Sequence, residues 1–280
     1  MSRRPTAGEA HRGPVAGPRL SVLSVVTLGF VAFFLIAVIA LIVADLLYTD
    51  AKSFAGILRS REILAAAKLS LLTSGVTLLL VLVFAVPMGY ALSRYRFRGH
   101  SLVDTIVDLP IVLPPIVIGV SILVFFRPPM GEWFESIGLG FVHTVKGIVL
   151  VQFLVSASYG VRAAAAAFDG VERRLEDLAL TLGCTRGQAF WRVALPMARN
   201  GIVAGGIMAW ARAVGVFGPL MVVAGSVRMK TEVLPTTIYL ELTVGGLKLA
   251  LAEALVMLAM ATVALIAIHA LAPGRRWWGG

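Results

Sequence analysis

Long apolar stretches dominate this chain and decide what it can fold into. A helix needs about 20 largely apolar residues to cross the hydrocarbon core of a bilayer. Hydrophobic residues make up 59% of the 280 residues and charged residues only 14%, whereas soluble domains are nearer about 45–50% and about 25%. The sequence therefore predicts an all-α, polytopic membrane bundle of about six transmembrane helices, at residues 20–47, 65–92, 102–126, 145–161, 202–224 and 247–271.

Composition divides the chain further. Residues 1–19 are polar and rich in Gly, Pro and Arg, so we predict a disordered cytoplasmic tail. Residues 20–47 are too long for the apolar region of a signal peptide, and no clear cleavage pattern follows, so we predict a retained N-terminal transmembrane helix. Residues 63–270 form the predicted core, with a cytoplasmic loop at 169–196.

Basic residues are distributed unevenly between the two sides of the predicted bundle. Fifteen of the 25 Lys and Arg lie before the first segment, between the second and third, between the fourth and fifth (Arg162 included), or after the last. The positive-inside rule therefore predicts that both termini and residues 169–196 are cytoplasmic. Juxtamembrane arginines facing anionic lipid explain the net charge of +10, and no nucleic-acid partner is needed.

Residues 169–196, DGVERRLEDLALTLGCTRGQAFWRVALP, are a charged, amphipathic island in this apolar chain. Asp169 and Glu172 have the spacing of a capping box, which predicts the start of a short helix. Gly183 is expected to end that helix in the left-handed conformation. One apolar stripe at helical spacing is formed by Val171, Leu175, Leu178, Ala179 and Leu182.

A second short helix is predicted after the turn. Thr185 and Gln188 again have capping-box spacing, and Pro196 is expected to end the helix because it lacks a backbone N–H. Cys184, the single cysteine, lies in the turn between the two helices and permits no intrachain disulfide.

The same island resembles the EAA motif of ABC importer permeases, which reads E-A-A, three residues, G, nine residues, I-x-L-P. Here the pattern is Asp177-Leu178-Ala179, three residues, Gly183, nine residues and Val193-Ala194-Leu195-Pro196. In that family the element is the coupling helix, which sits in a cleft of a cytoplasmic ATPase subunit. The resemblance implies that the ATPase docks on Leu175, Asp177, Ala179, Gly183, Cys184, Thr185, Arg186, Leu195 and Pro196.

Two further stretches resemble permeases for molybdate, tungstate and sulfate. Residues 108–119, DLPIVLPPIVIG, are similar to the LPLVLPP segment of molybdate-type permeases, and their paired prolines are expected to bend or break the helix. Residues 210–219, WARAVGVFGP, are similar to the F-A-R-x-x-G-E-F-G-A segment, and residues 229–235, MKTEVLP, to a loop of sulfate-type members. The resemblance implies that the translocation pathway is lined by Pro114, Pro115, Arg212 and Phe217.

One position departs from that pattern, because Val216 stands where the family has an acid. The acid would follow Arg212 by four residues, the spacing at which side chains meet on a helix. An arginine inside a membrane span usually faces a partner or a wet cavity. Either Glu253 of the last segment is that partner, or Arg212 faces water and a passing anion, or it reaches an interface.

The chain carries no G-x-x-x-x-G-K-[ST] phosphate loop and no histidine spacing typical of a metal site. ATP and Mg²⁺ are therefore expected in a partner subunit, with no cofactor or metal in this chain and no enzymatic activity of its own. The sequence predicts the permease subunit of an oxyanion importer in the inner membrane of a bacterium or archaeon. Its expected partners are cytoplasmic ATPase subunits, an extracytoplasmic binding protein, membrane lipid and a second copy of the chain.

Three alternatives stay open. An ABC importer of the same kind could carry ferric iron or a small organic solute, because permeases for different substrates share the EAA pattern. An intramembrane enzyme would need a Ser/His or Asp/Asp pair in facing spans, and the four His positions do not offer one. A non-transporting membrane scaffold would need neither the Gly183 turn nor a proline-broken third span.

Overall fold

A computed structural model of the chain describes residues 22–49, 54, 56 and 60–271. These described residues form helices and connecting loops, and no strand occurs among them. They belong to two compact units, Met1–Leu47 and Tyr48–Gly280, and each is considered by itself. The predicted tail at 1–19 lies outside the described residues.

The first unit contains one long helix, α1 (Val22–Tyr48). Its 27 residues include none that is buried, and it is apolar on every side. A helix of this length rises about 40 Å, which is enough to cross a bilayer. The first predicted span is thus a single helix whose length and composition suit a membrane crossing.

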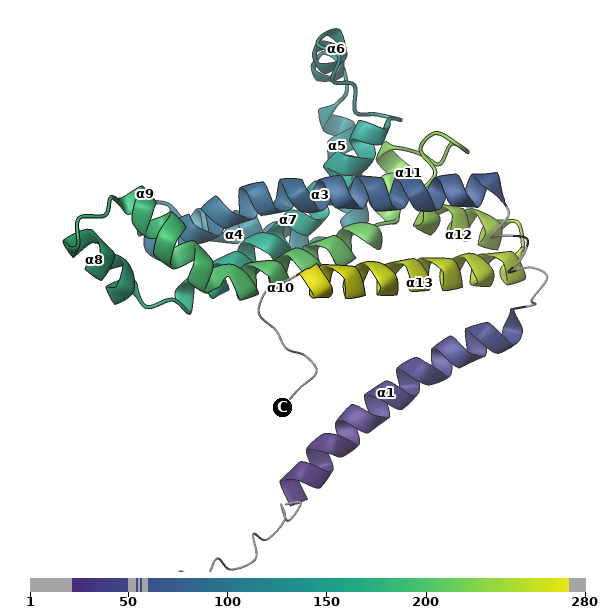
Figure 1. Ribbon diagram of the computed structural model, residues 1–280. Helices are drawn as coiled ribbons and strands as arrows, with labels where there is room; N and C mark the ends of the chain where they lie inside the picture. The colour runs from purple at the N-terminus through teal and green to yellow at the C-terminus, as the bar shows by residue number, and fades with distance from the viewer. Residues whose placement is uncertain (1–21, 50–53, 55, 57–59, 272–280) are drawn as a thin grey trace, which may run out of the picture. The chain divides into compact units, whose positions relative to one another are not determined.

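The core of the second unit consists of three helices, α3 (Arg61–Arg94), α7 (Val145–Asp169) and α10 (Leu195–Val214) (Figure 1). Small residues lie where they cross: a Cβ on Gly160 would come 2.5 Å from Val81 Cγ1, and one on Gly205 would overlap the Cβ of Ala163. Helices in lipid gain little from the hydrophobic effect, so such close approach supplies the packing energy between them.

The third predicted span is two helices rather than one. α4 (His100–Val112) and α5 (Pro115–Phe125) meet at 110°. Leu113 is extended, as a residue before proline prefers, and Pro114 and Pro115 offer no N–H to continue the helix. The predicted break is confirmed, but neither half alone is long enough to cross a bilayer.

The fifth predicted span, 202–224, is also not a single helix. α10 ends at Val214, and α11 (Gly218–Val223) begins after a short break with Pro219 in its first turn. By length and composition, the described residues contain four helices able to cross a membrane, or five if α4 and α5 count as one. α10 is 20 residues long, but its first half carries the polar residues Arg199 and Asn200.

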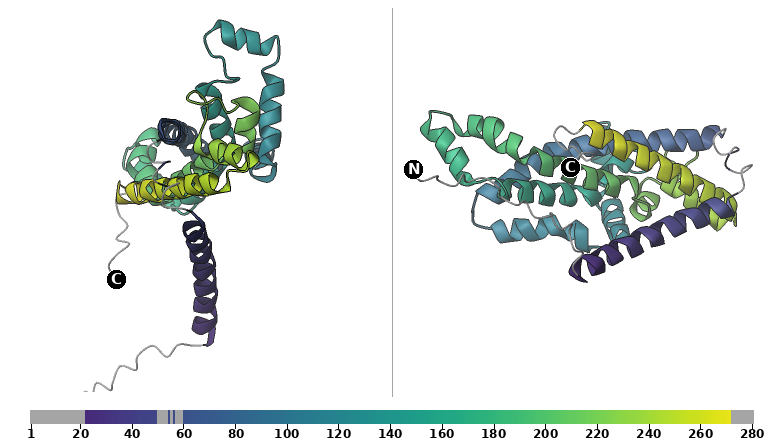
Figure 2. Two further views of the ribbon diagram at one scale, coloured as in Figure 1. Left: turned by 90° about the vertical axis from the view of Figure 1, so that its right-hand side faces the viewer. Right: turned by 60° about the horizontal axis from the view of Figure 1, so that its bottom comes forward.

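The remaining elements lie at the ends of the bundle. α8 (Arg173–Thr181), α9 (Arg186–Ala189) and a π-helical turn (Phe190–Ala194) form one end. α12 (Leu234–Thr243) and the start of α13 (Leu247–Leu271) lie at the opposite end, while α5 leads to α6 (Met130–Ser136) beside the bundle (Figures 1 and 2). The residues predicted to bind an ATPase, in and around α8 and α9, therefore lie at the opposite end of the bundle from α12.

The close approach of α3 and α7 yields a first prediction. In Gly89→Ala, the new Cβ would lie 2.6 Å from Ala164 Cβ and 2.7 Å from the backbone N of Ala165. Because backbone cannot move aside cheaply, we expect a loss of about 1–3 kcal/mol and a lower unfolding midpoint in lipid nanodiscs. Gly75→Ala on the same helix is the control, since its Cβ would meet nothing within 4 Å. Equal midpoints for the two variants would contradict this packing.

Candidate functional site

The docking segment, residues 169–196, begins differently from the prediction. α7 runs on to Asp169, and α8 starts only at Arg173, with Glu172 in the N-cap position but making no side-chain cap. The predicted capping box at Asp169 and Glu172 is therefore wrong. The cause is the run of five alanines at 163–167, the residue that favours helix most, which extends α7 and also places Arg162 inside it rather than in the loop.

The turn inside the docking segment matches the prediction. Gly183 has φ of +90°, the left-handed conformation that glycine adopts at little cost. Thr185 Oγ1 accepts a hydrogen bond from the Gln188 N–H at 3.3 Å, and Gln188 Oε1 accepts one from the Thr185 N–H at 2.9 Å. This capping box starts α9, as expected from the sequence.

The second helix of the docking segment does not end at Pro196. It passes through the π-helical turn Phe190–Ala194 and continues as α10, with Pro196 in the first turn. In the π turn the Leu195 N–H donates to the carbonyl of Phe190, five residues back. The wider turn accommodates the proline ring, so the predicted end at Pro196 is wrong.

The predicted docking residues differ in exposure. Ala179 is buried against the rest of the protein. The predicted set of docking residues omits three large apolar side chains that the segment exposes: Leu178 is 57%, Leu182 78% and Trp191 67% exposed. The predicted residues that are exposed are Asp177, Gly183, Thr185, Arg186 and Pro196. Those that are half-buried are Leu175, Cys184 and Leu195.

Polar contacts attach the inner face of α8 to the end of α3. Glu176 is only 8% exposed, and its carboxylate accepts hydrogen bonds from Arg94 Nε and from the Tyr90 hydroxyl, each at 2.7 Å. We call Tyr90, Arg94 and Glu176 the polar anchor. Breaking a buried ion pair by removing one partner typically costs about 3–5 kcal/mol. Sequence reasoning missed all three residues, because nothing in the sequence pairs positions 94 and 176.

A cavity of about 190 Å³ opens beside the polar anchor, between α3, α8 and α9. Besides the three anchor residues, it is lined by Tyr95, Arg173, Asp177, Leu180, Arg186 and Ala189. Two of the predicted docking residues, Asp177 and Arg186, therefore border this cavity.

A second cavity lies where the two broken helices meet. It has a volume of about 280 Å³ and is lined by Pro115, Ile116, Arg212, Gly215, Val216, Phe217, Gly218 and Pro219. We call it the Arg212 cavity. The structure thus brings together Pro115, Arg212 and Phe217, three of the four residues predicted for the pathway, while Pro114 precedes α5 without being among the lining residues.

The two broken helices approach each other closely beside this cavity. A Cβ on Gly119 of α5 would come 2.6 Å from the Cα of Pro219 in α11. Phe217 stacks on Tyr239 of α12, with ring centroids 4.7 Å apart. Irregular backbone at membrane depth is tolerated where protein covers it or a cavity is lined by it, and both conditions hold here.

Arg212 has no acidic partner in the described part of the chain. Its guanidinium lies 5.9 Å from the ring centroid of Tyr159, and its buried Nε makes no hydrogen bond within the described residues. Val216, at the family's acidic position, is buried and lies beyond the end of α10. The i, i+4 helical relation expected from the sequence therefore does not apply.

Glu253, the alternative partner, lines a different cavity of about 220 Å³ near the start of α13. The ion pairs formed among the described residues do not join it to Arg212. Arg228 bonds there to Glu62 at 3.0 Å and lies 3.7 Å from Glu241. Glu232 also lines this cavity. Burial raises the pKa of its carboxyl group, and the nearby charge of Arg228 opposes that rise.

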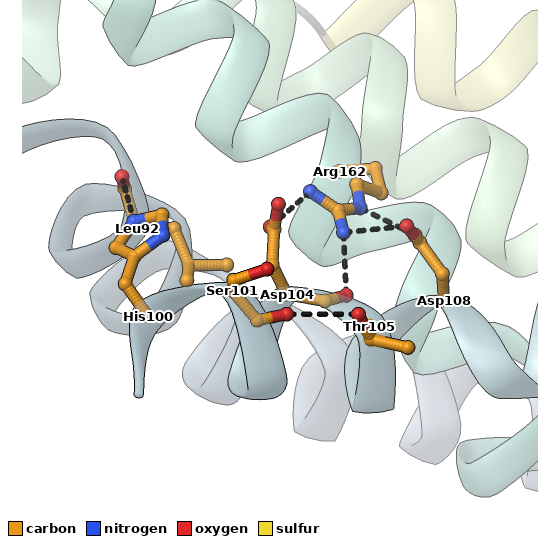
Figure 3. Close-up of polar contacts among 7 residues, drawn as sticks. All are labelled: Leu92, His100, Ser101, Asp104, Thr105, Asp108 and Arg162. Atoms are coloured by element: carbon orange, nitrogen blue, oxygen red, sulfur yellow. Dashed lines mark hydrogen bonds and ion pairs between the residues drawn. The ribbon is translucent and has the colours of Figure 1, made fainter. Parts of the chain in front are cut away.

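A third charged group connects α4 and α7. Figure 3 shows Arg162 between Asp104 and Asp108, with its Nε 2.5 Å from Asp108 and its Nη1 2.6 Å from Asp104. Nη2 also donates to the backbone carbonyl of Asp104 at 2.7 Å, so every guanidinium nitrogen is used. Arg162 therefore has its charge balanced within the chain, unlike Arg212. Among the described residues, no group of three or more His, Cys, Asp or Glu side chains has the arrangement of a metal site.

Comparisons with known proteins agree with this architecture. A chain in the crystal structure of a bacterial alginate ABC transporter, in complex with an alginate-bound periplasmic protein, superposes with a TM-score of 0.69, covering 90% of this chain and 92% of that one. At 21% identity this likeness shows the fold alone.

Sequence relatives identify the family. Residues 82–277 match the family model of the binding-protein-dependent transport system inner membrane component. The molybdate/tungstate transport system permease protein WtpB of Thermococcus kodakarensis is 39% identical, over 68% of this chain and 74% of that protein. The sulfate transport system permease protein CysT of Escherichia coli is 31% identical, over 86% and 88%. The chain belongs to this family and is an integral inner-membrane permease subunit of an ABC importer.

Proposed function

We propose that this permease carries a tetrahedral oxyanion, such as molybdate, tungstate or sulfate, across the membrane through a pathway that includes the Arg212 cavity. The observation that carries the proposal is an arginine that has no acidic partner among the described residues and lies in a cavity formed by two broken helices. The names of the relatives, which refer to molybdate, tungstate and sulfate, support the same substrate class.

The electrostatics of the cavity suit a dianion. A fixed positive charge lowers the free energy of an anion in a low-dielectric constriction. Pro115, the first residue of α5, lines the cavity, so the positive end of that helix dipole opens onto it. Arg162 does not compete for the anion, because Asp104 and Asp108 already occupy its guanidinium.

The docking segment supplies the contact with an ATPase. ATP and Mg²⁺ would be held by that cytoplasmic subunit, and this chain would contribute the exposed residues of 169–196 without a cofactor of its own. An extracytoplasmic binding protein would deliver the oxyanion at the opposite end of the bundle, near α12. Two copies of the chain would enclose the pathway, and both termini would be cytoplasmic.

Uptake measurements on Arg212 variants test the substrate and the site together. In liposomes containing the permease, its ATPase and its binding protein, the wild type should import molybdate, tungstate or sulfate. Arg212→Gln should lower that uptake about tenfold or more, since a charged hydrogen-bond donor is lost. Arg212→Lys should restore part of it, because it keeps the charge but not the planar fork.

Arg199→Gln is the matched control, since Arg199 is an exposed arginine of the same helix, away from the cavity. Its uptake should equal that of the wild type, and all variants should co-purify with the ATPase. Normal uptake by Arg212→Gln would refute the pathway role of Arg212. Import of ferric iron or an organic solute in place of the three oxyanions would refute the substrate.

Cysteine labelling tests the orientation. In a Cys184→Ser background, Ser136→Cys on exposed α6 should react with a membrane-impermeant thiol reagent in intact cells. In the wild type, Cys184 should react only after the membrane is permeabilised. Labelling of Cys184 in intact cells would place the docking segment outside and remove the ATPase contact.

Gly183→Val tests the docking segment. A β-branched residue resists φ of +90°, so the turn between α8 and α9 should change while the membrane helices stay inserted. We expect substrate-stimulated ATP hydrolysis by the reconstituted complex to fall. Gly75→Val should leave it unchanged, because Gly75 has ordinary helical backbone and open space around it. Stimulation equal to the wild type in both variants would rule out this segment as the coupling element.

A further inference from the structure

We propose that Tyr90 and Arg94 are positioning residues that hold the docking helix α8 through Glu176 and transmit its movement to α3. This inference rests on the proposed function, because it assumes that an ATPase binds the docking segment. It concerns a different end of the molecule from the Arg212 cavity and a contact that the sequence motif does not contain.

Few side chains hold α8 in place, and the strongest contacts among them are polar. It has nine residues, and only Glu176 and Ala179 are buried. A helix this short is unstable by itself in water, so its position depends on tertiary contacts. Its covered apolar side chains are Ala179, which is buried, and Leu175 and Leu180, which are half-buried, while the ionic contact of Glu176 is its most buried polar attachment.

Tyr90 joins four segments of the chain. Its ring makes edge-to-face contacts with Phe168 at the end of α7, 5.2 Å between centroids, and with Phe190 of the π turn, 4.8 Å. Its hydroxyl donates to Glu176 Oε2. A displacement of α8 therefore acts on Tyr90, and the aromatic contacts restrict how that side chain can yield.

Arg94 uses its planar fork at the same place. Nε donates to Glu176, while Nη2 donates to the carbonyl of Val171 at 2.9 Å in the loop before α8. The side chains of Arg94 and Glu176 are 7% and 11% exposed, so water screens the pair little. A lysine would keep the charge but could not make both contacts.

The backbone beside Arg94 is held as well. Arg173, in the first turn of α8, donates to the carbonyl of Ser93 at 2.5 Å, and the Ser93 hydroxyl donates to Asp169 at 2.6 Å. The last turn of α3 is thus tied to both ends of the loop that precedes α8. Since α3 packs along α7 and α10, a force on the outer side of α8 reaches the core helices through this joint.

Transport stoichiometry tests this role in the full complex. Glu176→Gln, Tyr90→Phe and Arg94→Lys each remove part of the polar anchor and leave the exposed docking residues unchanged. We expect the number of oxyanions imported per ATP hydrolysed to fall about tenfold, as expected when a charged hydrogen bond is lost, while co-purification with the ATPase persists. Glu132→Gln is the control, because Glu132 is exposed on α6, outside the docking segment.

A distance measurement tests the joint without relying on transport. Spin labels on exposed Phe97 and Thr181, in a Cys184→Ser background, report the separation between the end of α3 and α8. Glu176→Gln should broaden the distance distribution in the purified permease, and Glu132→Gln on α6 should not.

The outcomes separate the alternatives. An unchanged distribution in Glu176→Gln would overturn the positioning role, and a broadened one with an unchanged stoichiometry would overturn transmission. Loss of assembly, hydrolysis and uptake in equal proportion in all three variants would reduce the anchor to a structural contact. Failure of the wild-type complex to import any oxyanion would instead refute the proposed function, while the distance measurement would still decide whether the anchor positions α8.

Discussion

The close packing of α3, α7 and α10 through small residues is the constraint on which the rest of the structure depends. Lipid is as apolar as the helix surfaces, so these helices associate through van der Waals contact, which needs backbones to approach. Gly160 and Gly205 allow that approach. The polar anchor sits on the last turns of α3, and the Arg212 cavity lies beyond the end of α10, so both sites take their positions from this core.

The residues of the proposed pathway lie where two helices are interrupted, before α5 and after α10. The breaks at Leu113–Pro114 and after Val214 leave backbone groups that lipid could not satisfy. They face each other instead, and Gly119 lets Pro219 approach closely. An arginine is tolerable there because the cavity separates it from lipid. The same irregularity that interrupts two predicted spans forms the cavity that we propose as part of the pathway for a polar substrate.

Local signals in the sequence predicted local structure well. The left-handed Gly183, the capping box of Thr185 and the break at Pro114 each follow from one or a few adjacent residues. The predicted start of a helix at Asp169 was wrong. The five alanines at 163–167 favour helix more strongly than Asp169 favours a cap, so α7 continues to Asp169. The contact between Arg94 and Glu176 could not be predicted from the sequence, since it joins residues 82 positions apart and depends on how α3 and α7 pack.

The π-helical turn at Phe190–Ala194 lies within one continuous helical run that joins the docking segment to Arg212. It adds one residue to a helical run that begins at Arg186 and carries Arg212 near its far end. Its i to i+5 hydrogen bond takes five residues around a turn that an α-helix makes with four, so the bulge absorbs the extra residue and the helices on its two sides keep nearly the same phase. Loss of one residue within the turn would therefore leave regular helix and little rotation. Loss of one residue from α10 before Arg212 would instead rotate Arg212 by about 100° relative to the docking segment.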